Sequence, residues 1–352
     1  MTLNRWMTAG AAVVGRAHEQ QGAGCQDCVG YSDTSKFSAV ALADGAGSAK
    51  YASEGAGIAV NVLLRIIERS FSSFSQQPSD SIGKLIISSM ADGIESAAQT
   101  AGVAPREFAS TLLFAATGGG FLIAGQLGDG LIAVQKNGRM VPLCEPAKGE
   151  FKNETVFVTS PNAAKHIFVT LGPCDAVAGI VLMSDGSADS LFHNESRTFA
   201  QAVNNMAGWL DRHTPADVSK ALRENLWNVI RNRPGITDDC SIAVLRRVSI
   251  EVEDLAQRAR EFQSCYLNRK RADGLKNAFS VLRAMSVPRL ARGYVKQICT
   301  ATGLSPSAVR RHLHDLKEIC QLTFMDSTPV LASATQDKRA DVDSSPQPAF
   351  ER

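Results

Sequence analysis

The chain has 352 residues, of which 44% are hydrophobic and 20% charged, and its formal net charge is +2. This is the composition of an ordinary soluble protein with room for two domains. It excludes a membrane-spanning chain, since no apolar run reaches the roughly 18 residues that a spanning helix needs. The apolar stretch near the N-terminus is too short for a signal peptide, so we expect a cytoplasmic protein with no membrane partner.

The charge is unevenly distributed and divides the chain into three parts. Residues 1–250 carry a net charge of −2, whereas residues 251–325 hold 13 Lys and Arg against 7 Asp and Glu, a net charge of +6. Residues 326–352 are rich in Ser, Pro, Asp and Ala and carry few large apolar side chains. We therefore predict a first domain at 1–250, a basic helical domain at 251–325 and a disordered tail at 326–352.

The order of predicted elements in residues 1–250 indicates an α+β fold. Residues 7–35 read as an apolar run followed by a polar loop, and residues 71–80 as a connection. Strands are expected at 37–43, 110–117, 120–127, 131–136, 179–183 and 241–247, and helices at about 53–70, 82–101, 196–210 and 215–230. Many strands in the middle with helices at both flanks predict layers of sheet and helix rather than regular alternation.

An aspartate follows directly on a buried strand at residues 40–45. The apolar run Val40-Ala41-Leu42-Ala43 stops at Asp44-Gly45, a dipeptide that turns the chain sharply. A carboxyl group at the end of a buried strand is costly without a partner. Asp44 is thus either a turn residue or a ligand for a hard cation, since a carboxylate and a neighbouring carbonyl suit Mg²⁺ or Mn²⁺.

Other acidic residues occupy positions of the same kind. They are Asp27 after the polar loop, Asp129 and Asp185 directly after apolar runs, and Asp238 and Asp239 directly before one. Each could be a turn residue. Several strands with an aspartate at one end would nevertheless gather carboxylates along one rim of a sheet, where like charges need cations. The pattern predicts a site with two or more Mg²⁺ or Mn²⁺ ions, of the type that serves phosphate chemistry.

The order of these motifs resembles one protein family over about residues 10–248. The motifs are QD at 26–27, ADGAG at 43–47, ST at 110–111, GDG at 128–130, SDG at 184–186 and DDCS at 238–241. Together they resemble the metal-dependent Ser/Thr protein phosphatases of type 2C, the PPM family, and the opening GRAHEQQGAGCQD looks like its bacterial branch. The resemblance implies a two-layer β-sandwich flanked by pairs of antiparallel helices.

The resemblance also implies roles for the acidic residues. Asp44 would bridge two metal ions, with the Gly45 carbonyl as a further ligand, and Asp185 and Asp238 would complete the pair. Asp239 is the other candidate for this last place. We prefer Asp238 because the family's pattern places the metal-binding aspartate first.

Two further metal roles and a mechanism follow from the same resemblance. Asp27 would act through metal-bound water, and Asp129 would hold the looser third ion of bacterial members. A hydroxide that bridges two Mn²⁺ or Mg²⁺ ions would attack phosphorus in line while the metals neutralise the phosphoryl oxygens. No covalent enzyme intermediate is needed.

The chain departs from the family's pattern at two places. Many members carry a His, proposed as general acid, two residues after the bridging Asp, and here that residue is Ala46. Leaving-group protonation must then come from elsewhere. The family's phosphate-binding Arg usually lies closer to the QD pair than Arg16 does, so Arg16 and His18 are both catalytic candidates.

Two functions of different class are compatible with these departures. The first is an active phosphatase for phosphoserine and phosphothreonine in bacterial signalling, with a phosphoprotein substrate and a cognate Ser/Thr kinase. The alternative is a weak or inactive phosphatase-like sensor that is coupled to a helix-turn-helix regulator.

Residues 294–320 in the basic part have the spacing of a helix-turn-helix. Gly303 suits the tight turn, Ser305 is a natural N-cap and Pro306 suits the first position of the second helix. The second helix would direct its polar side chains away from its apolar face, and these are Arg310, Arg311, His314 and Lys317. They are candidate contacts to DNA or to a protein partner, and the basic charge is compatible with either.

Overall fold

The computed structural model describes residues 2–34, 36–144, 155–251, 299–300, 302–310, 322–325 and 328–331. The chain divides into two units. The larger consists chiefly of Trp6–Asp33 and Phe37–Arg247, and the smaller of Met1–Arg5, Thr34–Lys36 and Val248–Ser344.

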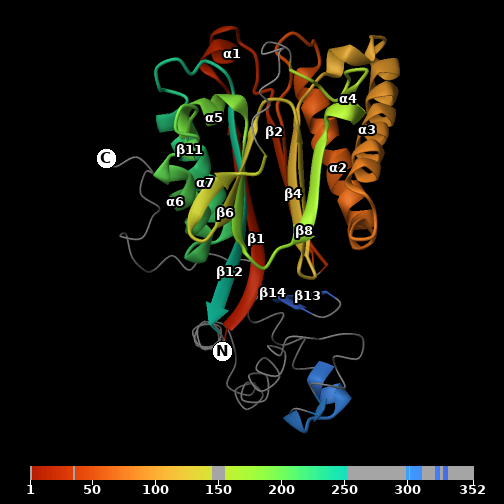
Figure 1. Cartoon of the computed structure of the whole chain (residues 1–352), viewed down its shortest axis with the longest axis vertical. Helices are drawn as coiled ribbons and strands as arrows, with labels where there is room; N and C mark the ends of the chain where they lie inside the picture. The colour runs from red at the N-terminus through yellow and green to blue at the C-terminus, as the bar shows by residue number, and fades with distance from the viewer. Residues whose placement is uncertain are drawn as a thin grey trace, which may run out of the picture. The chain divides into compact units, whose positions relative to one another are not determined.

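Two five-stranded sheets form the larger unit (Figure 1). The first has the order β1 (Thr2–Val13), β12 (Cys240–Glu251), β9 (Val177–Met183), β6 (Leu131–Lys136) and β7 (Arg139–Pro142). The second has the order β2 (Cys28–Asp33), β3 (Ser38–Ala43), β4 (Leu112–Gly118), β5 (Phe121–Leu127) and β8 (Phe168–Pro173). All neighbours in the second sheet pair antiparallel.

Strand β3 shows how the sequence builds two cores at once. All six of its residues are buried, and successive side chains of a strand point to opposite faces. Val40 and Leu42 belong to the core between the two sheets. Ala39, Ala41 and Ala43 belong to the core that the second sheet shares with its helices, where small side chains allow a helix to approach closely.

Helices cover the outer face of each sheet (Figure 1). Helices α2 (Ala52–Phe74) and α3 (Ser79–Ala101) pack on the second sheet. Helices α6 (Gln201–Gly208) and α7 (Pro215–Asn225) lie beside the first, and a short π-helix (Leu226–Ile230) continues α7. Thr214 caps α7 by accepting a hydrogen bond from the Asp217 N–H. The predicted α+β sandwich with flanking helices is thereby confirmed.

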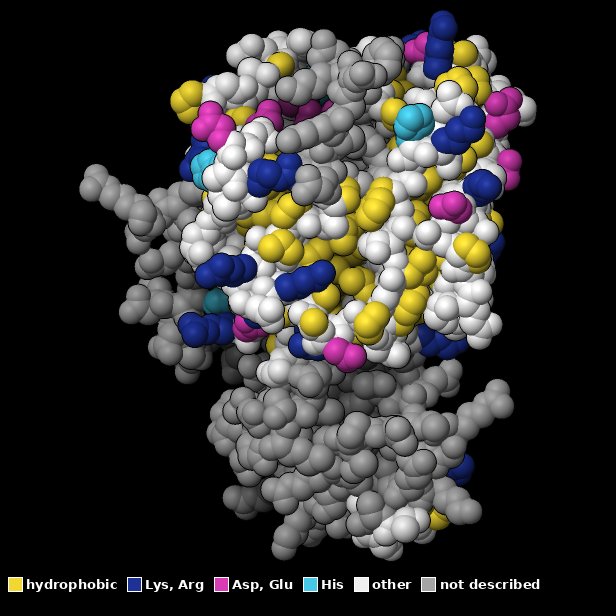
Figure 2. All heavy atoms as spheres, in the orientation of Figure 1, with side chains coloured by type: hydrophobic (Ala, Val, Ile, Leu, Met, Phe, Trp, Pro, Cys, Tyr) yellow, Lys and Arg dark blue, Asp and Glu magenta, His cyan; other side chains and the backbone are white. Residues whose placement is uncertain are grey.

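The remaining described elements of the larger unit are short and join these layers. They are α1 (Arg16–Gln20), a 3₁₀ turn (Pro105–Phe108), α4 (Ala163–His166), α5 (Asp185–Leu191), β10 (Phe192–His193), β11 (Thr198–Phe199) and a second 3₁₀ turn (Trp209–Asp211). The face of the molecule drawn in Figure 2 shows hydrophobic side chains at its surface. Val141 of β7 and Phe168 of β8 are exposed large hydrophobic residues.

Three predictions of secondary structure were wrong. Residues 7–35 are not mainly a loop, because they contain most of β1, all of α1 and all of β2. The connection predicted at 71–80 shortens because Phe71 and Phe74 are buried and extend α2. The helix predicted at 196–210 starts only at Gln201, because β10 and β11 form a hairpin in which the rings of Phe192 and Phe199 lie 4.8 Å apart.

In the smaller unit the described residues include the predicted turn. Gly303 has φ +70°, and the Ser305 hydroxyl accepts a hydrogen bond from the Ala308 N–H at 3.3 Å at the start of a helical stretch at 306–310. This confirms the predicted cap. Val309 is buried and Arg310 exposed, whereas Arg311, His314 and Lys317 lie outside the described residues.

A hairpin of β13 (Leu322–Met325) and β14 (Thr328–Leu331) reaches into the tail that was predicted to be disordered. Leu322, Phe324 and Val330 are apolar residues of the hairpin, and β14 lies within residues 326–352. Residues 332–352 of the tail lie outside the described residues. None of the described helices has the length and apolar character that crossing a membrane requires.

Candidate active site

Asp44 directly follows β3, and hydrogen bonds hold both its backbone N–H and its backbone carbonyl in place. Its N–H donates to Thr111 Oγ1 at 3.0 Å, and the Thr111 N–H donates back to the Asp44 carbonyl at 2.8 Å. The next amide, of Gly45, donates to the Gln26 carbonyl at 3.2 Å. A Cβ on Gly45 would lie 2.6 Å from the Ala52 carbonyl oxygen, so this position excludes any larger residue. The loop therefore presents Asp44 in a defined place.

Three carboxyl groups from distant parts of the chain influence one another here. Burial, together with the charges of Asp27 and Asp185, raises the pKa of Asp44 to about 11. Burial, together with the charge of Asp239, raises the pKa of Asp27 to about 7. The pKa of Asp185 is also raised, chiefly by burial. Without a cation, the site thus favours protonated carboxyl groups, as expected for buried like charges.

No lysine or arginine in the described part of the chain forms an ion pair with Asp27, Asp44 or Asp185. Asp185 is the first residue of α5 and accepts a hydrogen bond from the Gly186 N–H at 2.6 Å. This contact lowers the pKa of Asp185, but burial outweighs it. The protein supplies these carboxylates without a permanent counter-charge, which leaves that place for a cation.

Several buried oxygen atoms around these carboxyl groups have no hydrogen-bond partner. They are Gln26 Oε1, both carboxylate oxygens of Asp27, and the hydroxyl oxygens of Ser110, Ser187 and Ser241. The hydroxyl groups of Ser241 and Ser184 lie near enough to lower the pKa of Asp27, although they do not reach normal hydrogen-bond geometry. Buried polar atoms are rarely left unpaired, and oxygen atoms are the ligands that Mg²⁺ and Mn²⁺ prefer. These residues fit divalent cations with their water.

Asp129 lies at the exposed margin of the acidic cluster. Its Oδ2 accepts a hydrogen bond from the Thr155 hydroxyl at 2.6 Å. Its negative charge contributes, after burial, to the raised pKa of both Asp185 and Asp189. Asp189 is a further acidic residue beside this cluster, and the sequence analysis did not name it. Its spacing of four residues from Asp185 in a helix was the signal that could have found it.

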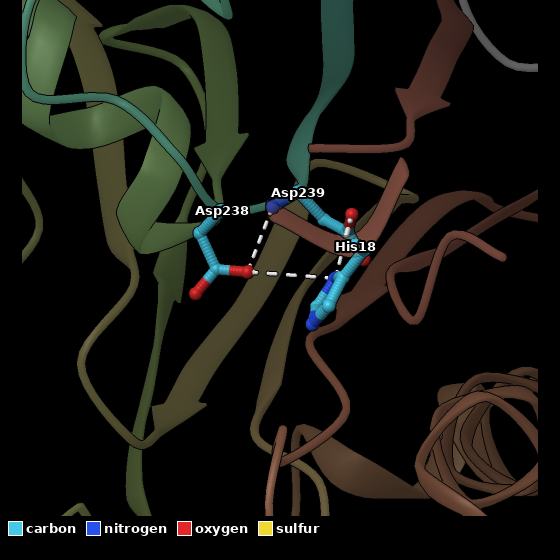
Figure 3. Close-up of side chains that lie close together, drawn as sticks. All are labelled: His18, Asp238 and Asp239. Atoms are coloured by element: carbon cyan, nitrogen blue, oxygen red, sulfur yellow. Dashed lines mark hydrogen bonds and ion pairs between the residues drawn. The ribbon is translucent and has the colours of Figure 1, made fainter. Parts of the chain in front are cut away.

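Asp239 is almost fully buried, and both of its carboxylate oxygens accept hydrogen bonds from backbone N–H groups. Its Oδ1 accepts from the Gly15 N–H and its Oδ2 from the Gln26 N–H, each at 2.5 Å. Its relative exposure is 1%, against 51% for Asp238. Figure 3 shows the His18 ring against this pair, with Nδ1 3.0 Å from Asp239 Oδ1 and 3.9 Å from Asp238 Oδ1. These three side chains offer ligand atoms within 4.8 Å of one another.

The two basic candidates for phosphate binding differ in their surroundings. The Arg16 guanidinium donates to the backbone carbonyls of Ile236, at 2.5 and 3.1 Å, and of Arg233, at 3.3 Å. It thereby ties α1 to the loop before β12. His18 instead contacts the acidic pair, so the structure brings His18, but not the guanidinium of Arg16, against carboxylates.

A helix-flanked sandwich gathers Asp27, Asp44 and Asp185 at one place without an ion pair to any described lysine or arginine. This fold and this acidic site are those expected of a phosphatase of the metal-dependent class. The chain belongs to the protein phosphatase 2C family, whose sequence model matches residues 14–227, and it is a protein phosphatase. Residues 291–319 match a second model, described as bacterial regulatory protein, arsR family.

Individual proteins and solved structures are similar to this chain. Serine/threonine-protein phosphatase 3 of Escherichia coli (strain K12) is 28% identical over 181 residues, which are 49% of this chain and 71% of that protein. A solved bacterial serine phosphatase is 13% identical, with 70% of this chain and 98% of that one covered at a TM-score of 0.45. The serine/threonine phosphatase Stp1 from Staphylococcus aureus is 14% identical, with 71% of this chain and 96% of that one covered at a TM-score of 0.44.

Proposed function

We propose that the chain is a metal-dependent phosphatase that hydrolyses phosphoserine and phosphothreonine in proteins, as part of bacterial signalling. The observation that carries this proposal is the set of buried, unpaired oxygen atoms around Asp27, Asp44 and Asp185. Such a set suits divalent cations far better than it suits a metal-free fold. The reaction implies a cognate Ser/Thr kinase, and the cytoplasm remains our prediction for its location.

The residues divide into those that would hold Mg²⁺ or Mn²⁺ and those that hold the ligands in place. Asp44, Asp185 and Asp238 with the Gly45 carbonyl would bind two ions. Asp27 would act through water, and Asp129 would hold a third ion. When bound, such ions acidify water and neutralise phosphoryl oxygens.

Other residues orient this set. Thr111 fixes the Asp44 peptide, and Asp239 ties Gly15 and Gln26 to the loop before β12, which carries Asp238. Both oxygens of Asp239 already accept hydrogen bonds, so we assign it to support, with Asp238 as the ligand. Ala46 is buried where many relatives have a histidine and cannot donate a proton. His18 is the imidazole that contacts the acidic pair, so it remains a candidate for binding phosphate.

The test is hydrolysis of p-nitrophenyl phosphate and of a phosphothreonine peptide by the full chain, with Mn²⁺ and with EDTA. We expect turnover with Mn²⁺ and none with EDTA. The double variant Asp44→Asn, Asp185→Asn should be inactive but folded. Asp92→Asn, an exposed aspartate of α3, is the matched control and should keep full activity. A folded protein with no turnover in any divalent metal would refute the proposal.

A second candidate function rests on the arsR-type match at residues 291–319. In this alternative the phosphatase-like unit only senses phosphoprotein, and the helix-turn-helix binds DNA. The expected signature is DNA binding that weakens steeply with salt and does not depend on Mn²⁺, without phosphatase turnover. Metal-dependent turnover of a phosphopeptide would exclude a phosphatase-like unit that only senses phosphoprotein. Failure to bind DNA would instead leave a protein partner for the basic residues.

We also propose that residues 1–250 form the catalytic domain and residues 251–325 the basic domain. The division of the chain between Arg247 and Val248 supports this boundary. Limited proteolysis followed by mass spectrometry should yield a stable fragment that ends near residue 250. A first cut within 1–240 would contradict the boundary.

A further inference from the structure

A cavity of about 520 Å³ lies on the larger unit and has no part in the proposed reaction. Its volume is that of a site for a small molecule and exceeds the space that one side chain fills. It is lined by Ala12, Val13 and Val14 at the end of β1, Gly24 and Cys25 before β2, Arg223 and Glu224 of α7, and Trp227 and Asn228 of the π-helix. Most of this lining is apolar.

The charged groups of the cavity favour an anion. The Arg223 side chain forms no ion pair or hydrogen bond with any described residue, and it is exposed. Glu224 is the acidic residue of the lining, and its Oε1 lies 3.9 Å from Nζ of Lys220, one helical turn away. Arg223 therefore offers the ligand a positive charge that pairs with no described carboxylate.

The aromatic wall favours a flat apolar body. Trp227 lines the cavity, and its exposed fraction is 41%, which is high for such a large hydrophobic side chain. The Arg231 guanidinium, 3.7 Å from the ring centroid, stacks on one face of the ring and holds the indole in place. Irregular π-helical turns often accompany functional sites, and Trp227 stands in one.

Two segments that line the cavity continue along the chain to residues that hydrogen-bond Asp239 of the acidic site. The Val14 carbonyl accepts a hydrogen bond from Arg231 at 2.9 Å, and the next residue, Gly15, donates to Asp239 Oδ1. On the other wall, Cys25 is followed by Gln26, which donates to Asp239 Oδ2. A ligand that holds both walls would therefore act on the carboxylate that connects them.

We propose that this cavity binds a small amphipathic anion, with a flat apolar body between Val14 and Trp227 and its negative group on Arg223. We further propose that occupancy is coupled to metal binding at the acidic site. By thermodynamic linkage, the ligand and the metal must change each other's affinity by the same factor. This property goes beyond phosphatase activity and does not require it.

The probes are 1-naphthaleneacetate and its neutral counterpart 2-(1-naphthyl)ethanol, titrated calorimetrically into the full chain in EDTA. The acetate should bind about tenfold more tightly than the alcohol, as for a hydrogen-bonded charge. Arg223→Ala should remove this difference. Asn228→Trp, which places a large ring in the cavity from an exposed position, should weaken the binding of both probes. Arg65→Ala on α2 removes the same charge elsewhere and should change neither.

Equal affinity of the two probes for the unaltered chain would overturn the anion site, and so would binding that survives Asn228→Trp. The coupling is tested by Mn²⁺ titration with and without saturating 1-naphthaleneacetate, which should shift the Mn²⁺ dissociation constant. An unchanged constant would overturn the coupling. Because binding is measured in EDTA, the result does not depend on whether the protein turns over phosphopeptides.

Discussion

Asp239 and Gln26 are 213 positions apart in the sequence, yet Asp239 Oδ2 accepts a hydrogen bond from the Gln26 N–H at 2.5 Å. The residue after Gln26 is Asp27, and the residue before Asp239 is Asp238. One contact between a carboxylate and an amide thus sets the positions of two candidate metal ligands from opposite ends of the unit. The buried Asp239 carboxylate thus holds together the chain segments that carry Asp27 and Asp238.

The first prediction compares Asp239→Asn with Asp238→Asn. Both remove one negative charge, but only Asp239→Asn removes an acceptor from the Gly15 and Gln26 amides. A hydrogen bond to a charged group contributes about 1.5–3 kcal/mol. We expect Asp239→Asn to be less stable than Asp238→Asn by about 1–3 kcal/mol in urea unfolding with EDTA. It should also weaken Mn²⁺ binding by about 10–100-fold, as a supporting residue does. Equal unfolding midpoints would contradict this role.

A second prediction concerns the contact of Gly15 with the loop before β12, which carries Asp238 and Asp239. A Cβ at Gly15 would lie 2.2 Å from the Asp238 carbonyl carbon and 2.4 Å from its oxygen. Gly15→Ala should therefore lower the free energy of unfolding by at least about 1–3 kcal/mol. Gly24→Ala is the control, since a Cβ there meets no atom within 4 Å, and it should be neutral or slightly stabilising. Similar stability of the two variants would show that the backbone at 238–239 gives way.

The third prediction separates ligands from supporting residues by activity. Asp44→Asn and Asp185→Asn, made singly, should each lower kcat by more than the ~10–100-fold that supporting residues produce. Burial raises the pKa of both carboxyl groups, so the metal-free folded protein must protonate them or bury their charge, a cost that Asn avoids. We therefore expect the metal-free variants to unfold at a higher temperature than the unaltered chain. Phosphopeptide kinetics and thermal unfolding in EDTA would measure the two effects. Loss of activity together with loss of stability would instead indicate a structural role.

The fourth prediction concerns pH. Burial and the charge of Asp239 raise the pKa of Asp27 from 3.8 to about 7 in the folded protein. Between these values the folded state binds more protons than the unfolded state, so the free energy of unfolding falls as pH rises. Asn at position 27 cannot ionise. In EDTA, Asp27→Asn should therefore gain stability relative to the unaltered chain from pH 4 to pH 8. Urea unfolding at several pH values measures this difference, and a constant difference would contradict the raised pKa.

Most of the candidate acidic residues could be named from the sequence because they directly follow or precede an apolar run, whereas Asp27 follows a polar loop. Asp44 after β3 and Asp185 after β9 stand out because a charged residue directly follows an apolar run. The order of elements predicted layers of sheet and helix, and the two-layer sandwich was implied by the resemblance to the family. The hydrogen-bond partners of the Arg16 guanidinium could not be predicted from the sequence. Its acceptors, the carbonyls of Arg233 and Ile236, are 217 and 220 positions away. No local pattern encodes such a contact.

The missed strands β1 and β2 have a common physical cause. Both pack through glycine, which carries no apolar side chain for a periodicity to reveal. A Cβ at Gly10 of β1 would lie 2.6 Å from Val29, and one at Gly30 of β2 would lie 2.4 Å from Val60. The close approach that excludes a side chain also weakens the alternating pattern by which strands are recognised.

Strands β1 and β12 are hydrogen-bonded neighbours in one sheet, although they lie at opposite ends of the larger unit's sequence. At 5–20 residues per second, a ribosome delivers Gln26 about 10–40 s before Asp239. During synthesis the segment that carries Asp27 therefore has to wait without its anchoring carboxylate. The acidic site can form only when the last strand emerges, so a nascent chain carries no phosphatase activity until the whole catalytic unit has been made.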